Sequence, residues 1–540
     1  MPPPKAQTLA AVIDATAAEA PERAAIIYHG RSISYDELRD ASIIAARALL
    51  AKGVRPGDRI GVLLGNCPEW VVMALAADRV GAVFVPFNTW YKETEIAWTL
   101  DHCGISLLVA ATSFLKSRYD AIIAQLVPEL MTGSSWPLQS VRFPELRHVV
   151  FVGVEPSDPR SWQRFLGDGL VVTQSDLSAR SALLAGDRTA FILYTSGSTA
   201  SAKGVQLNHG HVVENGWYLG ARRGIGPDDR VWLGSPLFYG LGATNALPAT
   251  FTHGATLVLQ DFFEAERAIG VVHASSATVY YATGNMTRAM LDHSSFEKRL
   301  IGSLKKGNAG LGAEYKRLTL VEFGITGAVP AYGLTETYGN ATVGEVDDPI
   351  DVKIRSDGRL VPGMEITIID PDTGSPVATG AKGLVLIRGR TTPGYLGNPP
   401  EPSKALRPDG FFDTGDIGSF DAEGNFIFHV RLKEVIKSGG INVSPVEIEQ
   451  IIATHPDVRQ AYVVGVRSIA KGEFIIAFVE AFRSLTEADI RSYVKDRAAS
   501  YKAPHYVFFR REEQLPRLAS GKVAKHQLIE DARKELGLVD

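Results

Sequence analysis

The chain has 540 residues, 45% of them hydrophobic and 21% charged, and a net charge of −4. One hydrophobic core rarely serves more than about 250–300 residues, so this length predicts at least two domains. The near balance of 56 basic and 60 acidic residues argues against a nucleic-acid-binding protein, which would need a basic excess or stripe.

The cysteines and the apolar runs limit which metal sites, disulfides and membrane segments can be expected. The two cysteines, Cys67 and Cys103, form no CxxC pair, so neither a thiolate zinc site nor a disulfide scaffold is expected. We find no signal-peptide pattern at the N-terminus and no apolar run near the ~20 residues of a membrane helix. We therefore expect a cytoplasmic protein without stable membrane insertion, and the sequence leaves its oligomeric state open.

The first half of the chain alternates helical and strand-like patterns. Apolar spacing predicts helices over residues 35–52 and 68–80. Short apolar runs predict strands at residues 59–64, 82–86, 106–111, 149–154 and 189–194. Short strands that alternate with helices indicate βαβ units and a parallel sheet covered on both faces.

The residue pattern of the second half changes at two places, near residue 347 and after Arg431. Between residues 347 and 420, turn-rich clusters separate apolar runs at 365–369 and 383–387, which predicts a small antiparallel β-subdomain. After Arg431, the capping box Ser444-Pro445-Val446-Glu447 opens a helix. Strands at 461–466 and 474–481 and a helix near 486–499 follow it. We predict an α/β protein with an N-terminal domain over residues 1–430 and a small α+β C-terminal domain over residues 431–540.

The strongest chemical signal is the segment YTSGSTASAKG at residues 194–204, which follows an apolar strand. Small hydroxyl residues and glycines let backbone and side-chain donors converge on phosphate oxygens, and a lysine supplies a cation for the outer phosphates. The segment is not a Walker loop, because Lys203 follows Ala202. A flexible polar loop between two elements is the alternative. The candidate phosphate ligands are Thr195, Ser196, Gly197, Ser198, Thr199 and Lys203.

This segment resembles the phosphate loop of the adenylate-forming superfamily, which includes acyl-CoA synthetases, peptide-synthetase adenylation domains and luciferases. Five further segments match that family in the same order. One of them is AYGLTET at residues 331–337. The resemblance implies that Tyr332 stacks on adenine, that Thr335 contacts the α-phosphate and that Glu336 holds Mg²⁺. It also places Gly333 among the nucleotide-binding residues.

Two segments resemble the family's ribose-binding and domain-joining motifs. In Asp413-Thr414-Gly415-Asp416, the resemblance assigns the ribose hydroxyls to Asp416, although such a triplet alone is often a plain turn. In RLKEVIKSGGINVSP at residues 431–445, it assigns Arg431 to the ribose and Lys433 to the hinge between domains. Lys437, Ser438, Gly439 and Gly440 would line the channel for coenzyme A.

The last two matches concern catalysis and the acid. Ser520-Gly521-Lys522 resembles the catalytic-lysine loop, which implies that Lys522 contacts the carboxylate and the α-phosphate during adenylation. SPLFYG at residues 235–240 resembles a segment that lines the acyl pocket. The pocket candidates are Tyr239, Leu241, Asn245 and Tyr281. They are apolar or aromatic and uncharged, which favours an aliphatic or aromatic monocarboxylate.

The sequence departs from the family pattern in several places. Ala200 replaces the usual glycine and Ala202 the usual proline. The adenine-side segment reads Gly307-Asn308-Ala309-Gly310, in which Ala309 is the nucleotide-contacting candidate, and Val430 stands where glycine often precedes the arginine. These changes affect loop geometry but leave the charged candidates in place.

Together the matches imply an ATP- and Mg²⁺-dependent ligase that forms an acyl-adenylate and then passes the acyl group to coenzyme A. Two alternatives stay open at this point. The acceptor could be an amine or a carrier-protein thiol, although the Gly439-Gly440 pair favours the pantetheine arm of coenzyme A. The chain could also be a nucleotide-binding homologue with weak or no ligase activity.

Overall fold

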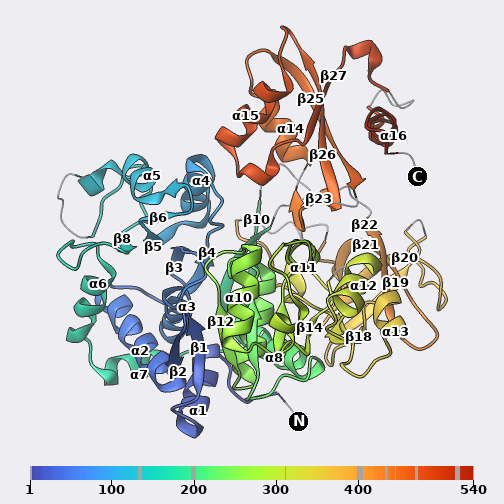
Figure 1. Ribbon diagram of the computed structural model, residues 1–540. Coiled ribbons are helices and arrows are strands. Elements are labelled where there is room, and N and C mark those ends of the chain that lie inside the picture. The colour runs from blue at the N-terminus through green and yellow to red at the C-terminus, as the bar shows by residue number, and fades with distance from the viewer. Residues whose placement is uncertain are drawn as a thin grey trace. The chain divides into compact units, whose positions relative to one another are not determined.

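A computed structural model describes residues 3–131, 137–195, 202–310, 312–371, 373–397, 405–431, 436–443, 445–468, 472–516 and 523–538 (Figure 1). The chain divides into two compact units. Unit 1 comprises Met1–Thr89, Thr99–Leu193 and Gly204–Val430, and unit 2 comprises Trp90–Trp98, Tyr194–Lys203 and Arg431–Asp540. The domain boundary after residue 430 stays a prediction, as does the hinge at Lys433, which lies outside the described residues. No described helix has the length and apolar character that crossing a membrane requires.

The first large sheet has six strands in the order β10-β9-β4-β3-β5-β8. They are β10 (Lys203–Asn208), β9 (Thr189–Thr195), β4 (Val83–Pro86), β3 (Arg59–Leu63), β5 (Ile105–Ala111) and β8 (His148–Val152). The pairs β3–β4, β3–β5, β4–β9 and β5–β8 are parallel. The predicted parallel sheet is therefore confirmed, with strand ends within two residues of expectation.

The second large sheet has seven strands in the order β15-β14-β13-β11-β12-β1-β2. They are β15 (Gly327–Val329), β14 (Lys306–Asn308), β13 (Val279–Tyr281), β11 (Arg230–Leu233), β12 (Thr256–Leu259), β1 (Ala24–Tyr28) and β2 (Arg31–Ser34). All neighbours run parallel except the β1–β2 hairpin.

Helices connect these strands, as βαβ units require. They are α1 (Leu9–Glu19), α2 (Tyr35–Ala51), α3 (Pro68–Val80), α4 (Glu93–Cys103), α5 (Tyr119–Leu126), α6 (Trp162–Asp168), α7 (Gln174–Ser181), α8 (His209–Arg222), α9 (Leu247–Thr252), α10 (Ala265–Ser275), α11 (Gly284–Leu291) and α12 (Ala313–Arg317). A capping box between Ser34 and Glu37 starts α2. Helix α3 starts at Pro68 and ends before Gly81, whose φ of 73° closes it.

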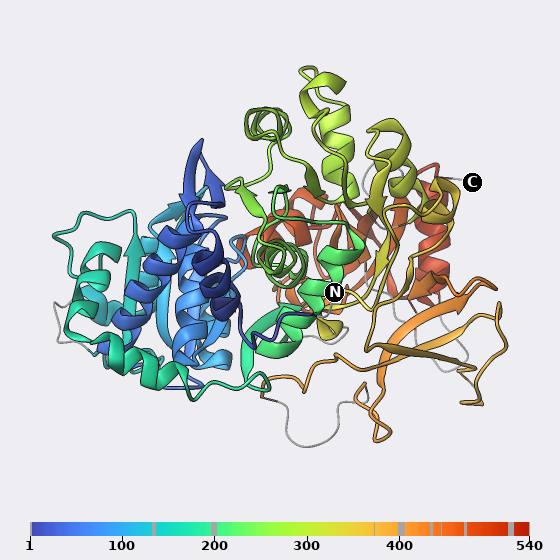
Figure 2. The ribbon, with the colours of Figure 1, turned by 90° about the horizontal axis from the view of Figure 1, so that it is seen from below.

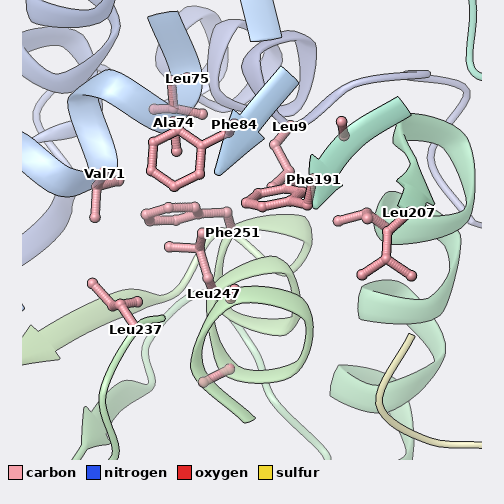
Figure 3. Packing of buried hydrophobic residues seen from close by; sticks show 14 of the residues in the cluster. Leu9, Val71, Ala74, Leu75, Phe84, Phe191, Leu207, Leu237, Leu247 and Phe251 are labelled. Atoms are coloured by element: carbon pink, nitrogen blue, oxygen red, sulfur yellow. The ribbon is translucent and has the colours of Figure 1, made fainter. Parts of the chain in front are cut away.

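A buried apolar cluster joins the two large sheets within unit 1. Phe84 and Phe191 come from the first sheet, and their rings meet edge to face at 5.6 Å. Figure 3 shows Phe251 of α9 pointing toward these two rings, with Val71 and Leu75 of α3 beside them. All five side chains are buried.

The small sheets complete unit 1. A four-stranded antiparallel sheet consists of β19 (Glu365–Ile369), β20 (Gly383–Arg388), β21 (Phe412–Phe420) and β22 (Phe426–Arg431), drawn in yellow to orange in Figure 2. A three-stranded sheet contains β16 (Ala331–Tyr332), β17 (Thr342–Val343) and β18 (Arg359–Leu360). The predicted antiparallel subdomain is confirmed, but it also contains α13 (Ile350–Arg355), and its sheet continues past residue 420 into β22.

Unit 2 has an α+β core, as expected. Its sheet has the order β24-β23-β26-β25, with β27 beside β26. The elements are β23 (Ile436–Ser438), β24 (Ile441–Val443), α14 (Pro445–Ala453), β25 (Val458–Ser468), β26 (Gly472–Ala481), α15 (Glu487–Arg497), β27 (Tyr506–Phe509) and α16 (Lys525–Glu535). Ile448 and Ile452 of α14 are buried in its apolar cluster. Ser444 of the predicted capping box lies outside the described part of the chain.

Candidate active site

The centre of the candidate site in unit 1 joins two of the predicted motifs. The hydroxyl of Tyr332 at the end of β16 donates a hydrogen bond of 2.8 Å to Oδ2 of Asp416 in β21. Their exposed fractions are 5% and 3%. Asp416 is fixed from its backbone as well, because its N–H donates to Oγ1 of Thr414 at 3.0 Å. The adenine and ribose candidates therefore lie side by side.

The ring of Tyr332 lies against two phenylalanines of β22. The ring centroids of Phe426 and Phe428 are 4.6 and 5.8 Å from that of Tyr332. The sequence analysis missed both, although the alternation of FIFHV at residues 426–430 indicates a strand with one buried face. A base stacked on Tyr332 would have to use the part of the ring that these two leave open.

The carboxylate of Glu336 is oriented by a tyrosine that the sequence analysis also missed. Glu336 lies in the short turn η6 (Thr335–Thr337), and its Oε1 accepts a hydrogen bond of 2.9 Å from the hydroxyl of Tyr395. The backbone N–H of Thr392 donates to the Glu336 carbonyl at 2.7 Å. Tyr395 is 59 residues from Glu336, and no local pattern marks it as a partner.

Gly333 and Thr335 stand where the chain is tightly packed. A Cβ at Gly333 would lie 2.5 Å from the Cα of Asn340, so only glycine fits without a shift. A Cβ at Gly240 would lie 3.6 Å from Oγ1 of Thr335. The turn that carries Thr335 therefore adjoins the segment of the predicted acid pocket.

Two of the four predicted pocket residues meet directly. The hydroxyl of Tyr281, at the end of β13, donates to Oδ1 of Asn245 at 3.2 Å, and Nδ2 of Asn245 donates to Oδ1 of Asn340. Asn245 and Leu241 lie in η3 (Leu241–Ala246), a π-helical turn, a distortion that is frequent at functional sites. Leu241 and Tyr239 are half-buried.

In the adenine-side segment Gly307-Asn308-Ala309-Gly310, the structure explains both Gly307 and the unusual Asn308. Gly307 has a φ of 141°, and a Cβ there would lie 2.1 Å from the carbonyl oxygen of Tyr280. Asn308 ties this strand end to Ala282, with its Nδ2 2.6 Å from the Ala282 carbonyl and its Oδ1 3.1 Å from the Ala282 N. Ala309 is buried and donates its N–H to the Val329 carbonyl.

In unit 2, the predicted coenzyme A residues form a tight hairpin. Lys437 and Ser438 end β23, and Gly439 and Gly440 form the turn to β24 with φ values of 60° and 79°. Two successive positive φ angles are the geometry of a type I′ hairpin turn, which favours glycine. Both glycines are exposed and Ser438 is buried. The turn explains the glycines locally, and their role toward coenzyme A stays a prediction.

Several predicted residues cannot be placed. Ser196, Gly197, Ser198, Thr199, Lys433 and Lys522 lie outside the described residues, as does Ala200. Thr195 ends β9 and Lys203 begins β10, so the described chain enters and leaves the phosphate loop through adjacent strands of one sheet. For Arg431, only the backbone at the end of β22 is described.

A family model described as "AMP-binding enzyme" matches residues 13–396, and one described as "AMP-binding enzyme C-terminal domain" matches residues 447–522. This chain belongs to the AMP-binding enzyme family. The expected membership of the adenylate-forming superfamily and the expected fold class are thereby confirmed, and the chain is a ligase-type enzyme by family.

Similar proteins cover almost the whole of this AMP-binding enzyme. It is 34% identical to a Mycobacterium tuberculosis CoA ligase named for a methyl-dioxo-octahydroindenyl propanoyl group, over 97% of this chain and 99% of the relative. It is 30% identical to the mitochondrial medium-chain acyl-CoA ligase ACSF2 of Bos taurus, over 98% of this chain and 88% of the relative.

Solved structures give the same picture of the fold. An o-succinylbenzoate CoA synthetase from Bacillus subtilis, bound with a product analogue, matches with a TM-score of 0.77 at 25% identity, over 96% of this chain and 98% of the other. The amide bond synthetase McbA from Marinactinospora thermotolerans matches with a TM-score of 0.79 at 23% identity, over 97% and 99%. The second likeness, at this identity, shows the fold alone.

Proposed function

We propose that this AMP-binding enzyme is an ATP-dependent carboxylic acid:CoA ligase. The acid carboxylate attacks the α-phosphorus of ATP and pyrophosphate leaves, which gives the acyl-adenylate. The thiol of coenzyme A then attacks the acyl carbon, and AMP leaves as the thioester forms. The observation that carries the proposal is the contact between Tyr332 and Asp416, in a chain that resembles CoA ligases over nearly its full length.

Each candidate nucleotide-binding side chain has a definite chemical task in this proposal. A carboxylate accepts hydrogen bonds at about four lone-pair sites, so Asp416 can receive the ribose hydroxyls while Tyr332 orients it. Thr335 lies on the following turn, where a hydroxyl can donate to the α-phosphate. Lys203 and Lys522 are cations suited to the phosphates and to the charge that develops on the α-phosphoryl oxygens.

A Mg²⁺ ion would neutralise charge on the phosphates of ATP when it is bound. The residues present fit such an ion, because the hydroxyl of Tyr395 holds the carboxylate of Glu336 in one orientation. No described group of three or more His, Cys, Asp or Glu side chains could hold a metal without the phosphates. Mg²⁺ usually takes one or two carboxylates and completes its shell with water and substrate phosphates. Glu336, whose Oε1 accepts a hydrogen bond from the hydroxyl of Tyr395, would supply that carboxylate.

The acid is expected to be an aliphatic or aromatic monocarboxylate, because Tyr239, Leu241, Asn245 and Tyr281 carry no charge. The named relatives act on a medium-chain acyl group and on a methyl-dioxo-octahydroindenyl propanoyl group, which fits a largely apolar pocket. Coenzyme A is the expected acceptor, and the exposed Gly439-Gly440 turn leaves a backbone surface that a pantetheine arm could follow.

A pyrophosphate-release assay across a panel of acids, with and without coenzyme A, tests the proposal. We expect release that depends on the acid, together with an acyl-CoA product identified by mass when coenzyme A is added. Products that form with an amine but not with coenzyme A would reject the acceptor. ATP binding without release for any acid would reject the ligase itself.

A further inference from the structure

Arg223, the residue that follows α8, is a buried cation without a carboxylate partner among the described residues. Its exposed fraction is 1%. Nη1 donates to the Leu219 carbonyl at 3.1 Å, and Nε has no hydrogen-bond partner within the described part of the chain. Burial lowers the pKa of its guanidinium, and only the neighbouring Tyr281 acts in the other direction.

Other buried cations of unit 1 are compensated. Lys316 pairs with Asp357 at 2.6 Å, and Arg390 pairs with Glu214 at 2.9 Å. Lys353 donates to two backbone carbonyls. A buried charge is costly unless it is paired and hydrogen-bonded. Arg223 differs from these three cations because it has neither a carboxylate partner nor a second hydrogen-bond acceptor among the described residues.

The charge of Arg223 lies next to the predicted acid pocket. Its Cζ is 5.1 Å from the ring centroid of Tyr281, and the hydroxyl of that tyrosine donates to Asn245. Arg223 thus faces one pocket candidate directly and is linked to a second through a hydrogen bond. In a dry interior, a positive charge acts over such distances far more strongly than in water.

We propose that Arg223 is a specificity-determining residue of the acid pocket, and that the enzyme prefers acids carrying a second oxygen acceptor away from the activated carboxylate. A carbonyl oxygen elsewhere in the monocarboxylate would meet the positive potential that the described residues leave uncompensated beside Tyr281. A plain hydrocarbon end gains nothing from that charge. This inference rests on the proposed ligase function.

The test compares kcat/KM for matched acids in the pyrophosphate-release assay. One set is hexanoate, its oxo derivative at the penultimate carbon, and adipate. The second set is phenylpropanoate with its para-acetyl and para-carboxy derivatives. We expect an oxygen-bearing acid to be preferred about tenfold or more over the plain acid, the range that a hydrogen bond to a charged group supplies. The oxo and dicarboxylate arms distinguish a neutral carbonyl from an anion.

Arg223→Met should reduce this preference to about one, with thermal stability unchanged or raised, because it removes an uncompensated buried charge. Arg222→Met is the matched control. Arg222 is adjacent, but it pairs with Glu345 and donates to the Leu360 carbonyl. Its loss should therefore lower kcat/KM by the same factor for every acid. Arg223→Gln provides a second uncharged variant should the Met variant fail to fold.

Equal rates for plain and oxygen-bearing acids in both sets would overturn the inference while leaving the ligase function intact. So would a preference that survives Arg223→Met or Arg223→Gln unchanged. Absence of acid-dependent pyrophosphate release with every acid would instead count against the proposed function, so the two failures are distinguishable.

Discussion

The hydroxyl of Tyr332 donates a 2.8 Å hydrogen bond to Asp416, a residue 84 positions further along the chain. Because this bond holds a buried carboxylate in one orientation, Asp416→Ala should raise the KM for ATP. Each hydrogen bond to a charged group contributes about 1.5–3 kcal/mol, so the loss of two ribose hydrogen bonds corresponds to about 100- to 10,000-fold. Steady-state kinetics with varied ATP measures it, and an unchanged KM would remove Asp416 from the nucleotide site.

Tyr332→Phe is the companion to that variant. It keeps the ring that packs against Phe426 and Phe428 and removes only the donor to Asp416. We expect a smaller rise in the KM for ATP than with Asp416→Ala, because the carboxylate remains but is held less firmly. An effect larger than that of Asp416→Ala would contradict this order, because the Tyr332 hydroxyl would then act through more than its hydrogen bond to Asp416.

Glu336→Gln should raise the Mg²⁺ concentration needed for half-maximal pyrophosphate release. The amide keeps the size of the side chain but loses the charge that a hard cation prefers. A Mg²⁺ titration at fixed ATP measures the shift. Tyr395→Phe, which removes the donor to Oε1 of Glu336, should shift the titration in the same direction by less, and identical curves for all three proteins would reject Glu336 as a metal ligand.

Lys522→Ala should abolish adenylation and leave thioester formation from supplied acyl-adenylate largely intact. The expected loss is about 100-fold or more, since it removes a cation aimed at charge that develops in the transition state. The two half-reactions are assayed separately, by pyrophosphate release and by acyl-CoA formation. Equal losses in both steps would contradict the hypothesis that Lys522 serves adenylation while the Gly439-Gly440 turn serves thioester formation.

Local chemistry explains which elements could be predicted. Pro68 and Gly81 bracket α3, so both of its ends followed from residue type alone. The strands β3 and β19 were likewise visible as apolar runs between turn residues. The β-subdomain was harder, because β22 begins only after the turn at Gly424. The alternation of FIFHV indicates a buried face but does not show that Tyr332 packs on it.

The site itself was only partly predictable. Tyr332, Glu336 and Asp416 were found through their motifs. The structure adds the hydrogen bond from Tyr332 to Asp416. Tyr395 and Arg223 carry no local signal, because their significance comes from partners 59 and 58 residues away. Contacts at such separations depend on how strands are ordered in a sheet, which apolar periodicity does not specify.

The buried His148 and the half-buried His253 predict a loss of stability in mild acid. Burial lowers the pKa of His148 and of His253 to about 4, while an unfolded histidine titrates near 6.5. Their contribution to stability is therefore fully present above pH 6.5 and is lost as the pH falls from 6.5 toward 4. Proton linkage lowers the free energy of unfolding by about 1–2 kcal/mol for each histidine at pH 5.

Urea unfolding at pH 7.5 and pH 5 checks this expectation. His253 stacks on Trp217 with ring centroids 4.5 Å apart, so His253→Phe keeps the packing and removes the titration. That variant should lose less stability between the two pH values than the wild type. An equal loss in both proteins would exclude His253 as a source of the acid sensitivity.

In unit 2, Lys502 is held between two carboxylates, and its removal should be costly. Its Nζ lies 2.7 Å from Oε1 of Glu95 and 2.6 Å from Oε1 of Glu447, and its side chain is 7% exposed. Burial raises the pKa of Glu95 and the lysine opposes that rise, while the two carboxylates raise the pKa of Lys502 against its own burial. Lys502→Met leaves the carboxylates facing each other, which should cost about 3–5 kcal/mol in denaturant unfolding.

Arg491→Met provides the control, because Arg491 pairs with Glu487 on α15, with side chains that are 40% and 41% exposed, and solvent-accessible pairs contribute about 0–1 kcal/mol. Adding Glu95→Gln to Lys502→Met should recover part of the loss, since it removes one of the two facing charges. If Lys502→Met cost no more than Arg491→Met, the pair energy would not exceed the cost of burying these charges. If the double variant were less stable than the single one, Glu95 would contribute through contacts other than its charge.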